Sequence, residues 1–168
     1  MLGLPIKKPN APEKIVWQHV SGRYEFAYVP TGIYLTNALF MITGEPSILK
    51  YLIGILNSKF ADYLLLLFTN LTTLGQYAYG AKDKIEQLPL PPITPKNQPI
   101  VKQIEDLVYK IISAKRRRLP SADASLQESN NLQVDTSDWE REIDQLVYKL
   151  YDLTEEEIKI VEASITQK

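Results

Sequence analysis

Residues 47–68 read SILKYLIGILNSKFADYLLLLF and contain the most apolar stretch of the chain, residues 60–68. Ser47 is a suitable N-cap, and the apolar side chains that follow it form a wide stripe. We therefore predict one long helix over residues 47–68 that is buried on most of its sides. The apolar stretch is much shorter than the roughly 20 residues needed to cross a bilayer, so we expect no membrane association.

The segment before this helix, residues 14–42, has the composition of a β-sheet. Residues 15–17 (IVW) are β-branched or aromatic, and residues 23–29 (RYEFAYV) are aromatic and roughly alternating. A Pro-Thr-Gly turn separates them from residues 33–42, which read as a strand pair or as one long strand. We expect Trp17 to lie in the core.

The segment after residue 68 is predicted to be mainly helical beyond a proline-rich connection at residues 89–95. Capping boxes at Ser137–Glu140 and Thr154–Glu157 predict a final pair of helices. The expected units are a body (1–96), a bracing helix (97–118), a flexible linker (119–135) and a C-terminal helix pair packed on the bracing helix (136–168).

The composition excludes several kinds of active site. The chain has no cysteine and one histidine, which excludes disulfides, a thiolate zinc site, a cysteine nucleophile and a multi-histidine metal site. It contains neither a glycine-rich phosphate loop nor a G-x-S-x-G elbow. We therefore predict no catalytic residues and no metal ligands. No signal peptide is visible, so a cytoplasmic protein is expected.

The charges are distributed unevenly along the chain. The net charge is −1, but residues 1–120 hold 15 Lys and Arg against 8 Asp and Glu, whereas residues 121–168 hold 4 against 12. A basic body followed by an acidic tail indicates a polyanionic partner for the body alone.

Candidate nucleic-acid contacts lie in the expected strands and in the loop that follows the long helix. Lys and Arg bind phosphates and guanine edges, Gln and Asn bind adenine, and aromatic side chains between lysines suit base or backbone contact. The candidates are Lys14, Gln18, His19, Arg23, Tyr28, Asn37, Gln76, Tyr77, Tyr79, Lys82 and Lys84. Two other roles stay open: strand tyrosines also serve in packing, and the basic run 115–118 also suits a helix C-terminus or the acidic final helices.

Six blocks of sequence, in this order along the chain, resemble the TaqI-like C-terminal specificity domain. They are KIVWQ (14–18), FAY (26–28), GIYLTN (32–37), LIGILNSK (52–59), IEQLPLP (85–91) and EIDQLVYKLY (142–151). The resemblance extends over about residues 13–162. It implies that Asn57, Ser58 and Lys59 fix a helix and its neighbours.

The resemblance also implies a function. Domains of this kind are the target-recognition part of type IIG restriction-modification enzymes and related adenine-specific DNA methyltransferases, whose core flips an adenine and methylates it with S-adenosylmethionine. This chain lacks the core's asparagine-proline-proline-aromatic motif and its glycine motif, which implies a non-catalytic C-terminal fragment. No cofactor is expected in the chain itself; S-adenosylmethionine and Mg²⁺ are expected in the parent enzyme.

We therefore expect an α+β fold: a mixed, β-rich target-recognition domain braced by long helices, with a C-terminal helical unit. Its expected partners are double-stranded DNA and the methyltransferase or nuclease portion of a parent enzyme. One alternative is a protein–protein docking module without independent DNA binding. Another, an enzyme in its own right, is disfavoured by the missing site motifs.

Overall fold

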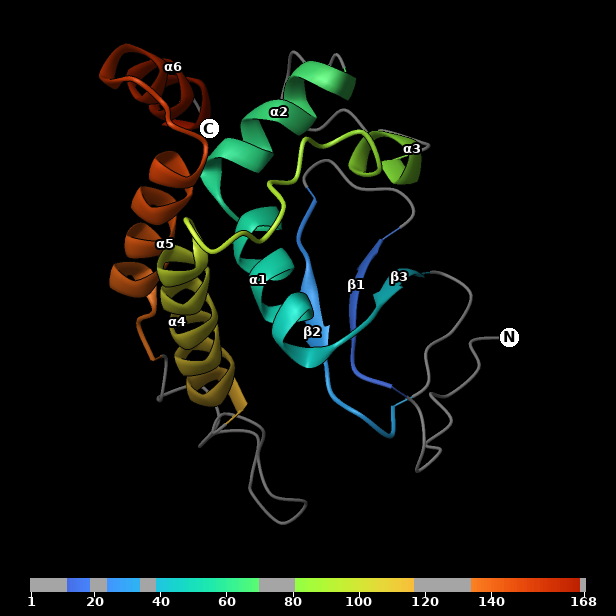
Figure 1. Cartoon of the computed structure of the whole chain (residues 1–168). Helices are drawn as coiled ribbons and strands as arrows, with labels where there is room; N and C mark the ends of the chain where they lie inside the picture. Colours follow the sequence, from blue (N-terminus) through green and yellow to red (C-terminus); the bar gives the residue numbers. More distant parts are fainter. Residues whose placement is uncertain (1–11, 19–23, 34–38, 70–80, 117–133, 167–168) are drawn as a thin grey trace.

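The structure is a computed structural model that describes residues 12–18, 24–33, 39–69, 81–116 and 134–166. These residues form a three-stranded sheet and six helices (Figure 1). The expected α+β class is confirmed, although helices rather than strands dominate the described residues.

The sheet is antiparallel with the order β2-β1-β3. The central strand β1 (Lys14–Gln18) pairs with β2 (Ala27–Val29) on one side and with β3 (Leu39–Thr43) on the other. Ile15 lies opposite Tyr28 and Ile42, so these three side chains share the face that packs on the helices. All four residues from Lys14 to Trp17 are buried, as expected for a central strand.

Trp17 is confirmed as a core residue and is 4% exposed. Its ring centroid lies 5.6 Å from that of Phe26 and 5.5 Å from that of Phe40, in tilted arrangements that aromatic pairs favour. These three rings join both edges of the sheet to the core.

The expected single helix over residues 47–68 is wrong, because the chain bends by 68° between α1 (Pro46–Leu56) and α2 (Lys59–Thr69). The Ser58 hydroxyl donates a hydrogen bond to the Ile55 carbonyl and accepts one from the Ala61 amide, so it ends the first helix and caps the second. The first helix also begins one residue before Ser47, with Pro46 in its first turn, where proline is favoured.

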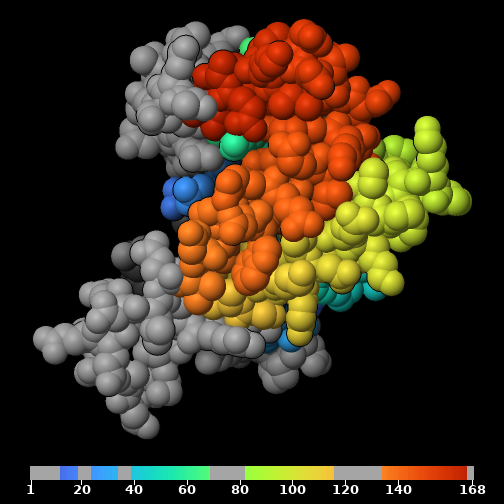
Figure 2. Space-filling model, turned by 90° about the vertical axis from the view of Figure 1, so that its left-hand side faces the viewer, coloured from blue at the N-terminus to red at the C-terminus, as the bar shows by residue number. Residues whose placement is uncertain are grey.

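The helix α1 occupies the centre of the fold (Figure 1). It contacts the sheet through β1 and, on another side, the helices α4 (Gln98–Arg116) and α5 (Ser137–Leu150). The expected packing of α5 on the bracing helix α4 is present, whereas α6 (Glu155–Thr166) packs against α2. Figure 2 shows α4, α5 and α6 lying together on one face of the molecule, beside the yellow-green segment that precedes α4 and small blue, teal and green patches of earlier segments.

Local signals fix the ends of the last helices. Thr154 and Glu157 form the predicted capping box: the Glu157 carboxylate accepts from the Thr154 amide at 2.8 Å, and the Glu157 amide donates to the Thr154 hydroxyl at 3.3 Å. The box expected at Ser137–Glu140 is wrong, because Ser137 already lies inside α5 and the residue before it is the N-cap, without a side-chain hydrogen bond to the helix backbone. The N-cap of α5 is Thr136, whose hydroxyl hydrogen-bonds to the Glu140 carboxylate at 2.7 Å.

One further helix, α3 (Ala81–Ile85), was not predicted from the sequence. It is only five residues long, but Ile85 and the nearby Leu88 are buried in the main core and fasten it to the body. The expected linker 119–135 lies almost entirely outside the described residues.

Among the described residues, no single helix is long and apolar enough to cross a membrane. The bent pair α1–α2 reaches the required length and composition only when both helices are counted together. Most of α1 is buried against the sheet, α4 and α5, which is the usual reason for such composition in a core helix.

Candidate nucleic-acid interface

Two of the predicted contacts, Lys14 and Gln18, share one face of β1 because they are four residues apart in a strand. Gln18 is exposed at the end of the strand. Lys14 is only 4% exposed, and its ammonium donates a hydrogen bond of 2.7 Å to the carbonyl of Ile33. Gln18 is therefore accessible to a partner, whereas Lys14 holds the turn that follows β2.

Tyr28 lies on the opposite face of the sheet, toward α1. Its hydroxyl donates a hydrogen bond to the Glu13 carboxylate, and the Lys50 ammonium lies 5.9 Å from the centre of its ring. The structure thus separates Tyr28 from Lys14 and Gln18 and engages it in packing between the sheet and a helix.

The predicted contacts Lys82 and Lys84 both lie on α3. Lys82 is exposed and pairs with Glu86 at 2.6 Å, one helical turn away, and Lys84 is partly exposed. The pKa of Lys82 is raised, mainly by its hydrogen bond to Glu86 and to a smaller extent by the negative charge of Glu86. A phosphate group that bound Lys82 would have to compete with this carboxylate.

The other predicted contacts, His19, Arg23, Asn37, Gln76, Tyr77 and Tyr79, lie outside the described residues. Nucleic-acid contact by the eleven candidates therefore stays a prediction. One open question about the basic run 115–118 is answered for Lys115, which pairs with Glu140 of α5 at 3.4 Å.

A mostly apolar groove of about 830 Å³ runs between β2 with its flanking residues, the α1–α2 junction, the end of α4 and the start of α5. Three cations line it: Lys59, Lys115 and Arg141. Each is paired with a carboxylate, of Glu162, Glu140 and Asp138 respectively. The groove therefore presents little net positive charge to a phosphate.

Residues 57–59, called the 57–59 junction below, connect α1 to α2. This junction contacts the chain at the β2 edge of the sheet, on the side away from β1. The side-chain amide of Asn57 accepts a hydrogen bond of 3.0 Å from the Phe26 amide and donates one of 2.9 Å to the Phe26 carbonyl. A single side chain thus satisfies both backbone groups of the residue that precedes the edge strand β2.

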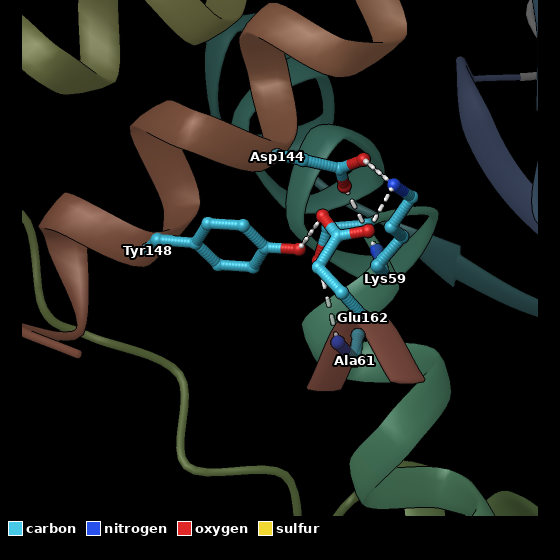
Figure 3. Close-up of polar contacts among 6 residues, drawn as sticks. Lys59, Ala61, Asp144, Tyr148 and Glu162 are labelled. Atoms are coloured by element: carbon cyan, nitrogen blue, oxygen red, sulfur yellow. Dashed lines mark hydrogen bonds and ion pairs between the residues drawn. The ribbon is translucent and has the colours of Figure 1, made fainter. Parts of the chain in front are cut away.

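Lys59, the last residue of the junction, binds both C-terminal helices (Figure 3). Its backbone amide donates to the Asp144 carboxylate of α5 at 2.9 Å, and its ammonium lies 2.7 Å from the Glu162 carboxylate of α6 and 3.9 Å from Asp144. The buried Tyr148 hydroxyl donates to the other oxygen of Glu162 at 2.9 Å. These four residues join α2, α5 and α6. The interpretation that the Asn-Ser-Lys sequence fixes a helix and its neighbours is confirmed.

The carboxylates of this cluster have opposite pKa shifts. Burial raises the pKa of Asp144 to about 6, against the opposing effects of the hydrogen bond and the charge of Lys59. Burial also acts to raise the pKa of Glu162, but the hydrogen bonds from Lys59 and Tyr148 outweigh it, and this pKa is lowered. Burial and the hydrogen bond to Glu162 raise the pKa of Tyr148.

We expect Asp144→Asn to change how stability depends on pH. A carboxyl with a raised pKa in the folded state contributes stability that is present below its ordinary pKa of 3.8 and is lost as the pH rises through about 6. The asparagine oxygen still accepts the Lys59 amide and carries no charge to bury. As the pH rises from 4.5 to 7.5, the free energy of unfolding of the variant should therefore increase relative to that of the wild type, by an amount on the order of 2 kcal/mol.

Urea unfolding of both proteins at several pH values measures this difference. Glu162→Gln serves as the comparison: the pKa of Glu162 is lowered, so the stability that its carboxylate contributes is lost as the pH falls, and the difference should have the opposite slope. Parallel stability curves for Asp144→Asn and the wild type would show that Asp144 titrates at its ordinary pKa.

Sequence reasoning missed Asp144, Tyr148 and Glu162 as partners of Lys59. Lys59 is separated from Asp144 by 85 residues and from Glu162 by 103, and no local pattern reports contacts over such distances. The available signal was the position of Asp144 on the apolar side of α5, next to Ile143 and Val147 in an otherwise amphipathic helix. A charge on that side needs a partner.

A comparison with protein families supports the resemblance over the first part of the chain, whereas the last of the six blocks, residues 142–151, lies beyond the match. The model of the TaqI-like C-terminal specificity domain matches residues 6–90, just over half of the chain. The match includes the sheet, α1, α2 and α3, and the helices α4, α5 and α6 follow it. A comparison with curated proteins gives no match. The chain belongs to the family of TaqI-like C-terminal specificity domains.

Proposed function

We propose that this chain is the target-recognition module of a restriction-modification enzyme or of an adenine-specific DNA methyltransferase, and that it binds a short double-stranded DNA sequence. The observation that carries the proposal is the match of the specificity-domain model to residues 6–90. That range contains the predicted contacts from Lys14 to Lys84. It also lies entirely within the basic part of the chain.

The described residues support a DNA-facing side formed by the body. Gln18 offers an amide suited to a base edge, and Lys82 and Lys84 offer ammonium groups suited to phosphates. The exposed acidic residues of α5 and α6, such as Glu142, Glu155 and Glu156, would repel a duplex. In this proposal the C-terminal helices face away from DNA, toward the remainder of the enzyme.

The catalytic steps would belong to the parent enzyme. We propose that this chain performs no chemistry, acts in the cytoplasm, and leaves S-adenosylmethionine and Mg²⁺ to the methyltransferase or nuclease portion. Among the described residues no group of three His, Asp or Glu side chains is arranged to hold a metal ion. The role of this chain would then be to bring the target sequence to the catalytic part.

A gel-shift experiment with the purified chain and a pool of short random-sequence duplexes tests the proposal. We expect a shifted complex at low salt, and repeated selection from the pool should enrich one sequence. Single strands of the same composition serve as the comparison. If no duplex is retained at low salt while the chain co-purifies with a methyltransferase or nuclease subunit, the chain is a docking module without DNA binding of its own.

The double substitution Lys82→Gln/Lys84→Gln tests the contribution of α3. If both ammonium groups bind phosphates, binding should weaken for all duplexes alike. The negative slope of log K against log salt should become shallower by about one for each phosphate that is no longer neutralised. The matched control is Lys149→Gln/Lys159→Gln, which removes two exposed cations from α5 and α6. An unchanged slope in the α3 variant would remove this helix from the interface.

A further inference from the structure

The hydrogen bonds of Asn57 imitate those of a neighbouring strand. In an antiparallel pair, two residues exchange N–H···O bonds in both directions, and the Asn57 amide makes this exchange with the Phe26 backbone. The strand β2 that follows has three residues, and within the described part of the chain it is an edge strand that pairs with β1. A short edge strand of this kind frays readily unless its ends are held.

The position of Phe26 determines what Asn57 can control. Its ring packs on Trp17, and Trp17 precedes the exposed Gln18 at the end of β1. The hydrogen bonds of Asn57 therefore fix the end of the β1–β2 pair at which a predicted base contact lies. Asn57 itself is exposed, so it contributes little to the core.

The other end of the junction is equally constrained. Ser58 fixes the bend between α1 and α2, and the following residue, Lys59, binds Asp144 of α5 and Glu162 of α6. Three consecutive residues thus connect the sheet to both C-terminal helices. The residue that binds the sheet, Asn57, and the residue that binds the C-terminal helices, Lys59, are separated by a single residue, Ser58.

We propose that Asn57 is a positioning residue for DNA recognition: it holds the end of the β1–β2 pair in a fixed orientation relative to α5 and α6. This inference rests on the proposed function. If the C-terminal helices face the catalytic part of the enzyme, the 57–59 junction sets the angle at which the sheet presents its reading residues. Asn57 touches the backbone of Phe26 and acts through it.

The test compares Asn57→Ala with Asn97→Ala in the full chain. Asn97 is a matched control because its amide makes the same two kinds of bond, accepting from the Thr94 amide at 2.8 Å and donating to the Pro92 carbonyl at 2.9 Å, at the start of α4. Both variants remove one side-chain amide that bonds to the backbone. Only Asn57→Ala frees the β1–β2 pair.

Two measurements decide the proposal. In hydrogen exchange, the Phe26 amide should exchange at least about tenfold faster in Asn57→Ala than in the wild type, and at an unchanged rate in Asn97→Ala. In selection from the random duplex pool, Asn57→Ala should keep the total binding and its salt dependence, but the preference for the sequence enriched by the wild type should fall about tenfold or more. A merely structural role would weaken all binding together.

Each negative outcome is distinguishable. Unchanged exchange at Phe26, or faster exchange with an unchanged sequence preference, overturns the positioning role. A wild-type chain that enriches no sequence contradicts the proposed function and with it this role in recognition, whereas the exchange measurement still decides whether Asn57 holds the strand. Asn57→Asp keeps the acceptor and loses the donor, so its exchange rate should lie between those of the wild type and Asn57→Ala.

Discussion

Replacing Lys59 with methionine is expected to lower the free energy of unfolding by about 2–4 kcal/mol. Methionine keeps most of the aliphatic volume but removes the charge that lies 2.7 Å from Glu162 and 3.9 Å from Asp144. The two carboxylates then face each other without the ammonium group of Lys59 between them, and the side chain of Asp144 is only 9% exposed. We place the effect below that of a fully buried pair because the Lys59 side chain is 33% exposed and partly screened by solvent.

Lys82→Met is the matched control for this change. Lys82 also pairs closely with a glutamate, but both side chains are more than half exposed, so the variant should unfold like the wild type. Urea unfolding at neutral pH and at pH 4.5 provides the measurement. The loss in Lys59→Met should shrink at the lower pH, where Asp144 is protonated. Equal stabilities for the two variants at neutral pH would show that the cluster does not hold the C-terminal helices.

Local patterns predicted the elements whose ends are set by short-range chemistry. The apolar spacing of residues 97–118 lies within two residues of the observed α4, and the Thr154–Glu157 box marks the start of α6. The β-branched and aromatic residues around Trp17 likewise lie in the central strand. In each case the stabilising contacts are made within a few residues, where the sequence displays them directly.

The break between α1 and α2 shows where the same method fails. Both helices bury apolar faces, so apolar residues recur at helical spacing on both sides of residues 57 and 58. Periodicity alone therefore predicts one helix. The competing signal was the Asn57-Ser58 pair, whose short polar side chains favour caps and turns over helix interiors. Ser58 caps α2, and Asn57 is used to hold the sheet. What the pair binds depends on tertiary contacts.

For the candidate interface, the sequence predicts the types of residue but not which of their side chains are exposed. The unequal charge of the two parts of the chain and the order of the sequence blocks indicate a DNA-reading body, which agrees with the family match at residues 6–90. The pattern could not distinguish the exposed Gln18 from the buried Lys14, because burial of Lys14 depends on the Ile33 carbonyl of a distant turn. Strand alternation places both on one face, but which face is covered is a tertiary property.

Gly54→Val is expected to lower the free energy of unfolding by about 3 kcal/mol, because α1 and α4 cross in close contact at this residue. A Cβ atom at Gly54 would lie 2.5 Å from the Cγ2 atom of Ile104 and 3.2 Å from that of Val108, both buried on α4. Neither methyl group can move freely in a packed core. Even Gly54→Ala should lose stability, although alanine favours a helix by about 0.5–1 kcal/mol relative to glycine.

Gly44→Val is the matched control, since among the described residues a Cβ atom there would meet Leu49 alone, at an ordinary 3.9 Å. Combining Gly54→Ala with Ile104→Ala provides a second test, because removing the obstructing methyl group makes room for the new one. The double variant should be more stable than the sum of the two single losses implies, by about 0.5–3 kcal/mol. Additive losses would mean that α1 and α4 separate readily at this point. The α1–α4 crossing would then not be the rigid base from which the 57–59 junction holds the sheet and the C-terminal helices.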